Sequence, residues 1–366
     1  MTTLYTTSFR GIGQVTVREL RFCFGDRLSR VRTDRVRDYD LVQFNYQGDP
    51  LALRQLGTVE DIFFSLADMP LSGEREDLNT IGEIPDLIPA LSIHRQFNGL
   101  PKGRTRYRVI VQASMQGWQS YRRNQMQEAV ERAVHRRFPK WRLVPDNANV
   151  ELWLQQTGKQ VRLGLRLTDR TMRHRTYKIA NRPASLRPTI ARALVQLTRP
   201  EDGDVFLDPM CGAGTVMIER ALAGRYALVQ GGDIDEQAVA DTLENFGNRH
   251  KPRDVYHWDA RRLPLPDQSV DKVATNPPWG RQVGSVFELR ALYGSAFAEI
   301  DRVLRPNGVV AVLSSEWNAI KDALARTNLT PIEHIKDIAV LGRRADIFVA
   351  QKFTGGHGGT APTYYL

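Results

Sequence analysis

Four short segments in the second half of the sequence carry the residues best suited to chemistry: DPMCGAGT at 208–215, GGDID at 231–235, WDA at 258–260 and NPPWG at 276–280. Gly212 and Gly214 let the backbone turn sharply and approach a ligand closely, ahead of a helix whose first N–H groups are free. Asp233 follows the next apolar run and can accept hydrogen bonds from both hydroxyls of a ribose. Asp259 follows a third run and can hold the amine or ring edge of an adenine. Together they predict a nucleoside site.

The NPPW segment favours a site for a planar amino group. Its prolines hold the backbone fixed, so the carbonyl of Pro277 and the side-chain oxygen of Asn276 can converge as two acceptors. A ring-conjugated amine is a poor nucleophile, and hydrogen bonds that pull on both its protons help to localise its lone pair. Trp279 would stack on the ring that carries the amine. The alternative is a rigid turn with a core tryptophan; the position after a fourth strand favours the functional interpretation.

The elements that must position these segments alternate between short apolar strands and longer helices from about residue 185 onward. This pattern predicts a mostly parallel, doubly wound α/β sheet, closed by two late strands as an antiparallel hairpin. Before it, the pattern favours two small α+β units, at 1–70 and about 90–170. Within the second, residues 122–138 predict a helix with an apolar face and a basic remainder.

Charge is concentrated in one segment. Residues 101–182 hold 19 Lys and Arg against 5 Asp and Glu, a net charge of +14, whereas the whole chain has +10. Such a block indicates a polyanion such as nucleic acid, because Lys and Arg that neutralise phosphates release counterions. A solvated surface is the alternative, and membrane lipid is a weaker one. The predicted contacts are arginines: Arg104, Arg122, Arg123, Arg136, Arg137, Arg173, Arg175 and Arg187.

Several classes of protein are disfavoured. No apolar run reaches the roughly 18 residues that cross a bilayer, and the first residues lack a secretory pattern, so we expect a cytoplasmic protein without a membrane partner. Cys23 and Cys211 are far apart and build no disulfide framework. Without CxxC or HExxH we expect no metal site.

In their order and spacing, the four segments resemble motifs I to IV of S-adenosylmethionine-dependent amino methyltransferases. With RTYKIANRPASLRPTIARAL at 175–194, they resemble more narrowly the THUMP-domain RNA guanine-N2 methyltransferases, which include tRNA guanosine-6 enzymes. The resemblance implies a Rossmann-like class I methyltransferase domain at 185–353 with a mostly parallel seven-stranded sheet. Before it we expect a ferredoxin-like α+β domain at 1–72, a THUMP-like RNA-binding domain at 73–172 and a linker at 173–184, and after it a flexible tail at 354–366.

The resemblance also implies roles for residues. S-adenosylmethionine would be bound by the motif residues Asp208, Met210, Cys211, Gly212, Gly214, Thr215, Asp233, Ile234, Asp259, Ala260 and Asn276. The catalytic group would be Asn276, Pro277, Pro278 and Trp279, with Trp where related enzymes usually carry Tyr. The implied reaction is in-line attack by guanine N2 on the methyl group without a covalent enzyme intermediate, so Cys211 is expected to be a packing residue.

The expected substrate is tRNA, at position 6 of the acceptor stem, and the expected state is a monomer. The same turn also serves 23S ribosomal RNA guanine-N2, adenine-N6 and protein-glutamine methylation, and these remain alternatives. An RNA-binding protein with a vestigial methyltransferase fold is the non-enzymatic alternative. The acids at Asp208, Asp233 and Asp259 argue against it.

Overall fold

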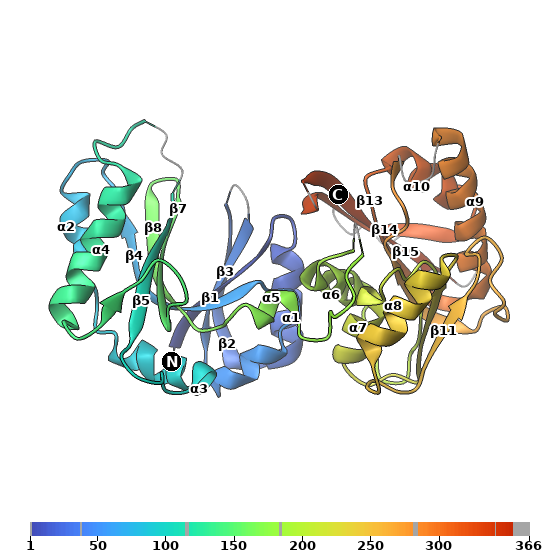
Figure 1. Ribbon diagram of the computed structural model, residues 1–366. Coiled ribbons are helices and arrows are strands. Elements are labelled where there is room, and N and C mark those ends of the chain that lie inside the picture. The colour runs from blue at the N-terminus through green and yellow to red at the C-terminus, as the bar shows by residue number, and fades with distance from the viewer. Residues whose placement is uncertain are drawn as a thin grey trace. The chain divides into compact units, whose positions relative to one another are not determined.

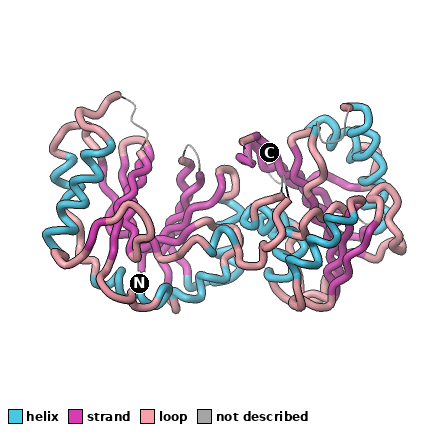
Figure 2. Tube along the Cα trace, viewed as in Figure 1, coloured by secondary structure: helices cyan, strands magenta, loops and turns pink. Residues whose placement is uncertain are grey.

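A computed structural model describes residues 2–36, 39–113, 117–182, 185–280, 285–340 and 342–353. The chain divides into two compact units, one of residues 1–8 and 20–172 and the other of residues 9–19 and 173–366. Figure 1 labels many of the helices and strands of both units, and Figure 2 colours them by type. The short segment 9–19 therefore belongs to the second unit although it lies near the start of the chain.

The first unit is built on one eight-stranded sheet in the order β2-β3-β1-β4-β8-β7-β5-β6. β4 pairs antiparallel with β8, so strands from both halves of this unit share one sheet. β5 runs parallel to both β6 and β7. The strands are β1 (Thr2–Phe9), β2 (Leu28–Arg35), β3 (Tyr39–Tyr46), β4 (Asp61–Pro70), β5 (Arg106–Gln112), β6 (Arg142–Leu143), β7 (Val150–Thr157) and β8 (Gln160–Arg166).

The helices between them include the basic helix that the sequence predicts. It is α4 (Arg123–Arg137), which buries Met126, Ala129, Val130, Ala133 and Val134 and leaves its arginines outside. The apolar spacing of three and four residues therefore gives one core face, as expected. The other helical segments of this unit are η1 (Gly25–Arg27), η2 (Pro50–Gln55), α2 (Asp77–Gly82) and α3 (Ile88–Asn98), and two helices, α1 (Gly13–Phe24) and α5 (Thr171–His174), have residues in both units.

The second unit contains the predicted doubly wound sheet, in the order β11-β10-β9-β12-β13-β15-β14. The first five of these strands pair in parallel, and β15 pairs antiparallel with β13 and with β14, which confirms the final hairpin. The strands are β9 (Val205–Asp208), β10 (Leu228–Asp233), β11 (Arg253–His257), β12 (Val270–Thr275), β13 (Leu304–Ser314), β14 (Leu329–Val340) and β15 (Arg343–Lys352).

Helices cover both faces of this sheet (Figure 2). The helices α6 (Pro188–Leu197), α7 (Thr215–Leu222) and α8 (Glu236–Phe246) contribute to one apolar cluster. The helices α9 (Val286–Val303) and α10 (Trp317–Leu324) contribute to the cluster on the other face. A sheet buried on both sides leaves its strand ends as the place for a polar site.

The α/β fold class is confirmed for the second unit. The division of the first unit at residue 72 into ferredoxin-like and THUMP-like domains stays a prediction, because the described strands form one continuous sheet. The compact-unit boundary falls between Met172 and Arg173, where the sequence places the start of the linker. The proposed tail at 354–366 lies outside the described residues.

Candidate functional site

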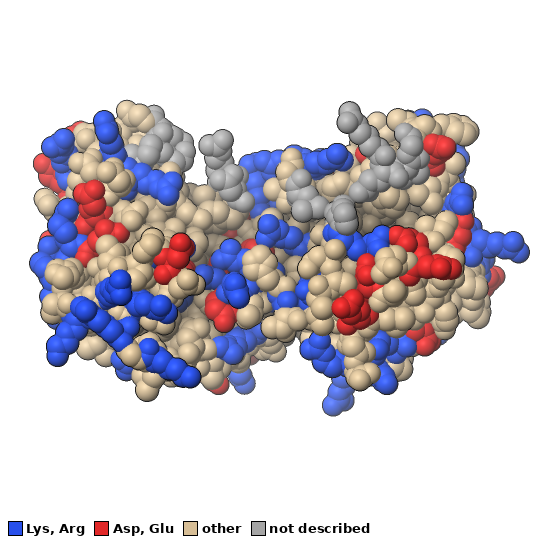
Figure 3. Space-filling view, in the orientation of Figure 1, with Lys and Arg blue, Asp and Glu red and all other residues tan. Residues whose placement is uncertain are grey.

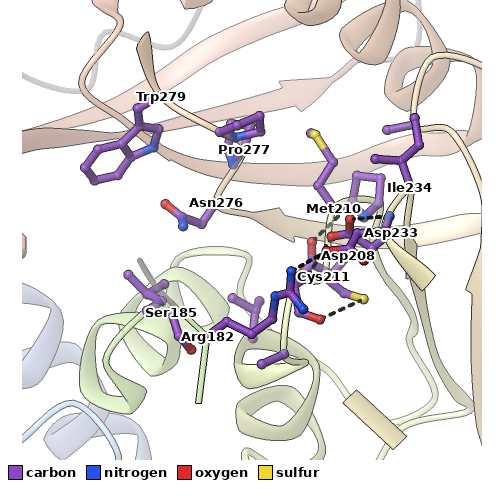
Figure 4. Close-up of a pocket in the computed structure, with 18 of the residues that line it drawn as sticks. Arg182, Ser185, Asp208, Met210, Cys211, Asp233, Ile234, Asn276, Pro277 and Trp279 are labelled. Carbon is purple, nitrogen blue, oxygen red and sulfur yellow. Dashed lines mark hydrogen bonds and ion pairs between the residues drawn. The ribbon is translucent and has the colours of Figure 1, made fainter. Parts of the chain in front are cut away.

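A cavity of about 940 Å³ opens at the carboxyl edge of the second sheet. In Figure 4, Asn276, Pro277 and Trp279 lie along its upper side, and Arg182 and Ser185 lie below. Its lining contains ten of the eleven predicted cofactor residues and all four predicted catalytic ones; Gly214 is the one predicted residue that does not line it. The lining residues that the sequence does not single out include Arg182, Ser185, Asp235, Arg261, Glu288, Leu292, Val340 and Arg343.

The glycine loop after β9 has the geometry that its sequence predicts. Gly212 has φ of 54° and Gly214 has φ of 75°, a region that side chains rarely adopt. A Cβ on Gly212 would meet nothing within 4 Å, so this backbone faces open space. Gly214 instead caps α7, and a Cβ there would lie 2.7 Å from Thr242 Cγ2. Gly212 therefore faces the cavity, whereas Gly214 permits close packing of the loop on α8.

Asp208, at the end of β9, is 1% exposed. Burial raises the pKa of its carboxyl from 3.8 to about 7, although its Oδ1 accepts a hydrogen bond from the Met210 N–H at 3.3 Å. Desolvation disfavours the charged form of a buried acid. Asp208 is thus a buried acid whose carboxyl holds its proton to a higher pH than an exposed aspartate does.

Asp233, at the end of β10, ties two loops together. Its Oδ2 accepts from the Gly212 N–H at 2.9 Å, and its Oδ1 accepts from the Asp235 N–H at 3.1 Å. The carboxylate is therefore held in one orientation at the cavity wall, and a carboxylate has further lone pairs for hydroxyl donors. Ile234, next to it, is 62% exposed and offers an apolar surface in the same wall.

Asp259 lines the cavity but is already engaged by a cation. Arg261 Nε donates to Asp259 Oδ2 at 2.9 Å and Arg261 Nη2 donates to the same oxygen at 2.6 Å. These hydrogen bonds lower the pKa of Asp259. Ala260 is buried beside it, and Trp258 donates from Nε1 to the Pro209 carbonyl at 3.0 Å, which joins this loop to the glycine loop.

The NPPW turn contains a hydrogen-bond acceptor without a donor. Asn276 Oδ1 is buried and has no hydrogen-bond partner among the residues that the structure describes. An unpaired buried acceptor costs about 1–3 kcal/mol, which a bound donor would recover. The turn is fixed from behind, because the Tyr293 hydroxyl donates to the Pro278 carbonyl at 2.9 Å and lies 3.0 Å from Ser314 Oγ. The carbonyl of Pro278 is thus occupied, and the polar atoms of Asn276 lie at the cavity.

Trp279 is largely buried, unlike an exposed ring on which a base could stack. It is 8% exposed, belongs to a core cluster and donates from Nε1 to the Leu313 carbonyl at 3.3 Å. It still lines the cavity, but most of the indole is packed against protein. Its stacking role stays a prediction.

Cys211 sits in the glycine loop as a packing residue. Its side chain is buried, with Sγ 3.6 Å from Thr242 Oγ1. Burial, with the nearby Asp208, raises the pKa of the thiol well above its usual range. A thiol that stays protonated is a poor nucleophile, so the structure supports a mechanism without a cysteine adduct. Cys23 is the other free cysteine.

The segment 175–187 is anchored by a buried ionic cluster that the sequence does not reveal. Glu219 is 0% exposed and accepts from Arg175 Nε at 3.1 Å, Arg192 Nε at 2.9 Å and the Tyr177 hydroxyl at 2.8 Å. Lys178 donates to the Leu186 carbonyl at 2.7 Å. Burial and the neighbouring Arg187 lower the pKa of Lys178 to about 8.

Arg182 extends from this segment into the cavity wall. It forms ion pairs with Asp235 and, at 3.0 Å, with Asp241. Ser185 and Leu186 line the cavity a few residues later. The segment predicted as part linker therefore forms one wall of the site.

The predicted RNA-binding arginines are spread over both units. Arg104, Arg122, Arg123, Arg136 and Arg137 are exposed in the first unit, where Figure 3 shows many Lys and Arg side chains. The other three belong to the second unit. Arg175 is engaged with buried Glu219 rather than presented to solvent, Arg187 lies over the Phe9 ring at 5.3 Å, and Arg173 is half-buried.

Two classes of feature are missing from the part of the chain that the structure describes. No group of three or more His, Cys, Asp or Glu residues there is arranged to hold a metal ion. No helix there is long and apolar enough to span a bilayer.

Comparison with solved structures identifies the fold. The crystal structure of TrmN from Thermus thermophilus matches with a TM-score of 0.75 and 23% identity, over 96% of this chain and 100% of that one. A methyltransferase named SMU.472, solved with S-adenosylhomocysteine, matches with a TM-score of 0.64 and 15% identity, over 98% and 99%. The second unit has the class I S-adenosylmethionine-dependent methyltransferase fold.

Sequence comparison finds a matching family model and named relatives. Residues 175–336 match the family described as RMKL-like, methyltransferase domain. The mouse protein named tRNA (guanine(6)-N(2))-methyltransferase THUMP3 is 31% identical over 190 residues, which are 48% of this chain and 37% of that protein. The Thermus thermophilus protein named tRNA (guanine(6)-N2)-methyltransferase is 29% identical over 250 residues, 66% of this chain and 72% of that protein. The chain thus spans little more than a third of the mouse relative.

The raised pKa of Asp208 predicts a pH-dependent stability. Between about pH 4 and pH 7 the folded protein holds a proton on Asp208 that the unfolded chain releases, so this group contributes stability at low pH that is lost as pH rises to 7. We expect Asp208→Asn to gain stability relative to the unmodified protein across that window, by at most about 1.4 kcal/mol per pH unit. Thermal unfolding followed by circular dichroism from pH 4 to 8 measures it.

Asp202→Asn serves as the control, because Asp202 is an exposed carboxyl shortly before the same strand. A stability difference between Asp208→Asn and the unmodified protein that stays constant with pH would contradict the assignment.

Proposed function

We propose that this protein transfers a methyl group from S-adenosylmethionine to the exocyclic N2 of a guanosine in tRNA, at position 6 of the acceptor stem. The observation that carries the proposal is the unpartnered buried Oδ1 of Asn276, in the wall of a cavity that also contains the glycine loop and Asp233. The names of the mouse and Thermus relatives support guanine-N2 of tRNA as the target. We also propose that the protein is cytoplasmic and monomeric.

The residues present fit the cofactor. The open space beside Gly212 and the fixed carboxylate of Asp233 suit a nucleoside with a ribose diol, and exposed Ile234 suits the flat face of an adenine. The lining also carries the acids Asp233 and Glu288, which accept hydrogen bonds from backbone N–H groups, and their negative charge favours a cationic ligand. Asp259 can serve the adenine amine only with lone pairs that Arg261 leaves free.

When bound, S-adenosylmethionine would supply the methyl group of its sulfonium: in-line attack by guanine N2 would form the N–CH3 bond and break the S–CH3 bond, neutral S-adenosylhomocysteine would leave, and N2 would lose one proton to solvent. Asn276 accepts a hydrogen bond from the N2 amino group and so increases the nucleophilic character of its lone pair. The Pro277 carbonyl is the second acceptor, and Pro278 is held by Tyr293 so that the turn keeps its shape. Oriented acceptors of this kind act mostly in the transition state, because N2 becomes more acidic as the bond to carbon forms.

Recognition of RNA is assigned to the exposed arginines of the first unit. Residues 101–182 hold the whole positive excess of the chain, and α4 presents Arg136 and Arg137 on its solvent side. A polyanion bound there would bring its target base to a separate catalytic unit.

Adenine-N6 and glutamine methylation remain compatible with the turn alone. The basic segment argues against a protein substrate, and the relatives' names argue against adenine. The 23S ribosomal RNA guanine is a substrate that the product assay below distinguishes from tRNA.

Asn276→Ala tests the central role. We expect turnover to fall by about 100-fold or more, while binding of cofactor and RNA stays within a few-fold, because the lost acceptor acts in the transition state. The measurement is nucleoside mass spectrometry of N2-methylguanosine in unmodified tRNA and ribosomal RNA incubated with S-adenosylmethionine. Methyladenosine, or no methylated nucleoside with the unmodified protein, would refute the proposed reaction.

Charge reversal of Arg136 and Arg137 to Glu tests the RNA surface. Both side chains are exposed on α4, so the fold should tolerate the change. We expect RNA affinity at 0.1 M salt to fall by about tenfold or more and the affinity for S-adenosylmethionine to be unchanged. Filter binding measures the first and calorimetry the second, and an equal loss of both would point to misfolding instead.

Arg343→Gln tests the cavity itself. Arg343 lines the cavity, and its guanidinium forms no ion pair with the residues that the structure describes. A free cation at a substrate cavity is suited to a phosphate, so the variant should raise KM for RNA several-fold and reduce the salt slope of binding by about 1. Arg344→Gln is the control, because Arg344 is exposed and is already paired with Asp337 at 3.3 Å. Equal effects of the two variants would contradict a specific role for Arg343.

A further inference from the structure

The helix α8 carries two polar side chains on the face that it buries. Its buried residues are Ala238, Thr242, Asn245 and Phe246, and Thr242 and Asn245 are 0% and 1% exposed. A buried polar group lowers the stability of the fold unless hydrogen bonds satisfy it, so the partners of these two side chains show what they hold. Neither residue lines the cavity, and neither takes part in the proposed reaction.

Asn245 is hydrogen-bonded on both sides of its amide. Its Oδ1 accepts from the N–H groups of Ile179 at 2.8 Å and Ala180 at 2.9 Å, and its Nδ2 donates to the carbonyls of Ala180 at 3.1 Å and Ala213 at 2.9 Å. Two donors on one side and two acceptors on the other decide which amide atom is the oxygen, because the flipped amide would face like groups. Asn245 therefore joins two segments of backbone that are distant in sequence.

Both segments belong to the wall of the cavity. Ala213 is part of the glycine loop and lines the cavity, and Ala180 lies two residues before Arg182, which also lines it. The side chain of Thr242 binds the glycine loop a second time, because its hydroxyl donates to the Gly212 carbonyl at 2.8 Å. The loop that approaches the ligand is thus held by two neighbouring side chains of α8.

The same stretch of α8 also holds the side chain of Arg182, whose Nη1 donates to Asp241 at 3.0 Å. Residues within five positions of one helix therefore hold the glycine loop and residues 179–182 at a fixed separation. A site whose walls are already in place loses less conformational freedom when its ligand binds. Resting on the proposed function, we propose that Thr242 and Asn245 are positioning residues that set this separation, and with it the affinity for S-adenosylmethionine.

Asn245→Asp tests the proposal with a side chain of nearly the same shape. The carboxylate can still accept from Ile179 and Ala180, but it places an oxygen against the carbonyls of Ala180 and Ala213, so the tie to the glycine loop is lost. The loop must then be ordered when the cofactor binds. We expect the Kd of S-adenosylmethionine to rise by about tenfold, as for the loss of one buried hydrogen bond, and the affinity for tRNA to be unchanged. Calorimetry measures the first and filter binding the second.

Asn98→Asp is the matched control. Asn98 Nδ2 also donates to two backbone carbonyls, those of His94 at 3.2 Å and Leu167 at 2.8 Å, but all three residues belong to the first unit. The substitution removes the same pair of donors, and the Kd of S-adenosylmethionine should stay that of the unmodified protein.

A pair of variants at Thr242 decides the matter even where Asn245→Asp does not fold. Thr242→Val removes the hydroxyl at nearly constant shape and should raise the Kd of S-adenosylmethionine several-fold. Thr242→Ser keeps the hydroxyl that donates to the Gly212 carbonyl and should bind the cofactor as the unmodified protein does. Equal values of Kd for the two variants would refute the proposal.

Calorimetry also separates positioning from stability. A residue that only stabilises the fold would lower the fraction of protein that binds S-adenosylmethionine and leave the Kd of that fraction unchanged, and this outcome would refute the proposal. If the unmodified protein forms N2-methylguanosine and the variants bind the cofactor as it does, positioning alone is refuted. If the unmodified protein binds no S-adenosylmethionine, the proposed function fails and the positioning role with it.

Discussion

Everything at the site depends on the parallel pairing of β9 with β10 on one side and with β12 on the other. Strand ends of a parallel sheet meet at one edge, so this pairing brings Asp208, Asp233 and Asn276 together from positions far apart in the chain. The backbones of β9 and β10 lie close together here, because a Cβ on Gly231 would lie 2.6 Å from the Asp208 carbonyl oxygen. Gly231 is therefore required for the backbone distance that lets Asp233 reach the Gly212 N–H.

A second constraint is the buried carboxylate of Glu219. A charge with no solvent exposure is tolerated only with partners, and Arg175, Arg192 and Tyr177 supply three donors. Because two of these donors come from the chain before α6, the ionic cluster also fixes the segment that forms one cavity wall. The helix α7 thus has two structural roles. Its first residue follows the glycine loop, and Glu219 in its interior holds the segment 175–187, which forms another wall of the cavity.

Most of the strands that the sequence predicts have apolar runs. It does not predict β2, because LSRVRTDR is a mostly polar edge strand with no continuous apolar face, and it anticipates β11 only as a third strand before Asp259. The motif residues are found from local spacing alone. The pairing of Arg175 with Glu219 and the position of Arg343 join residues distant in sequence, so no local pattern reveals them.

The two ligands of the proposed reaction make opposite electrostatic demands, since the cofactor is cationic at its sulfonium and RNA is a polyanion. Bare carboxylates around the cavity would repel an approaching phosphate over roughly a Debye length. Arg182 is paired with Asp235 and Asp241, and Arg261 is paired with Asp259. These ion pairs cancel much of the negative potential around the cavity, but the carboxylate oxygens can still accept hydrogen bonds from a ligand that touches them. Burial reduces the charge of Asp208 further by raising its pKa. The positive excess at 101–182 can then attract RNA without opposition from the site.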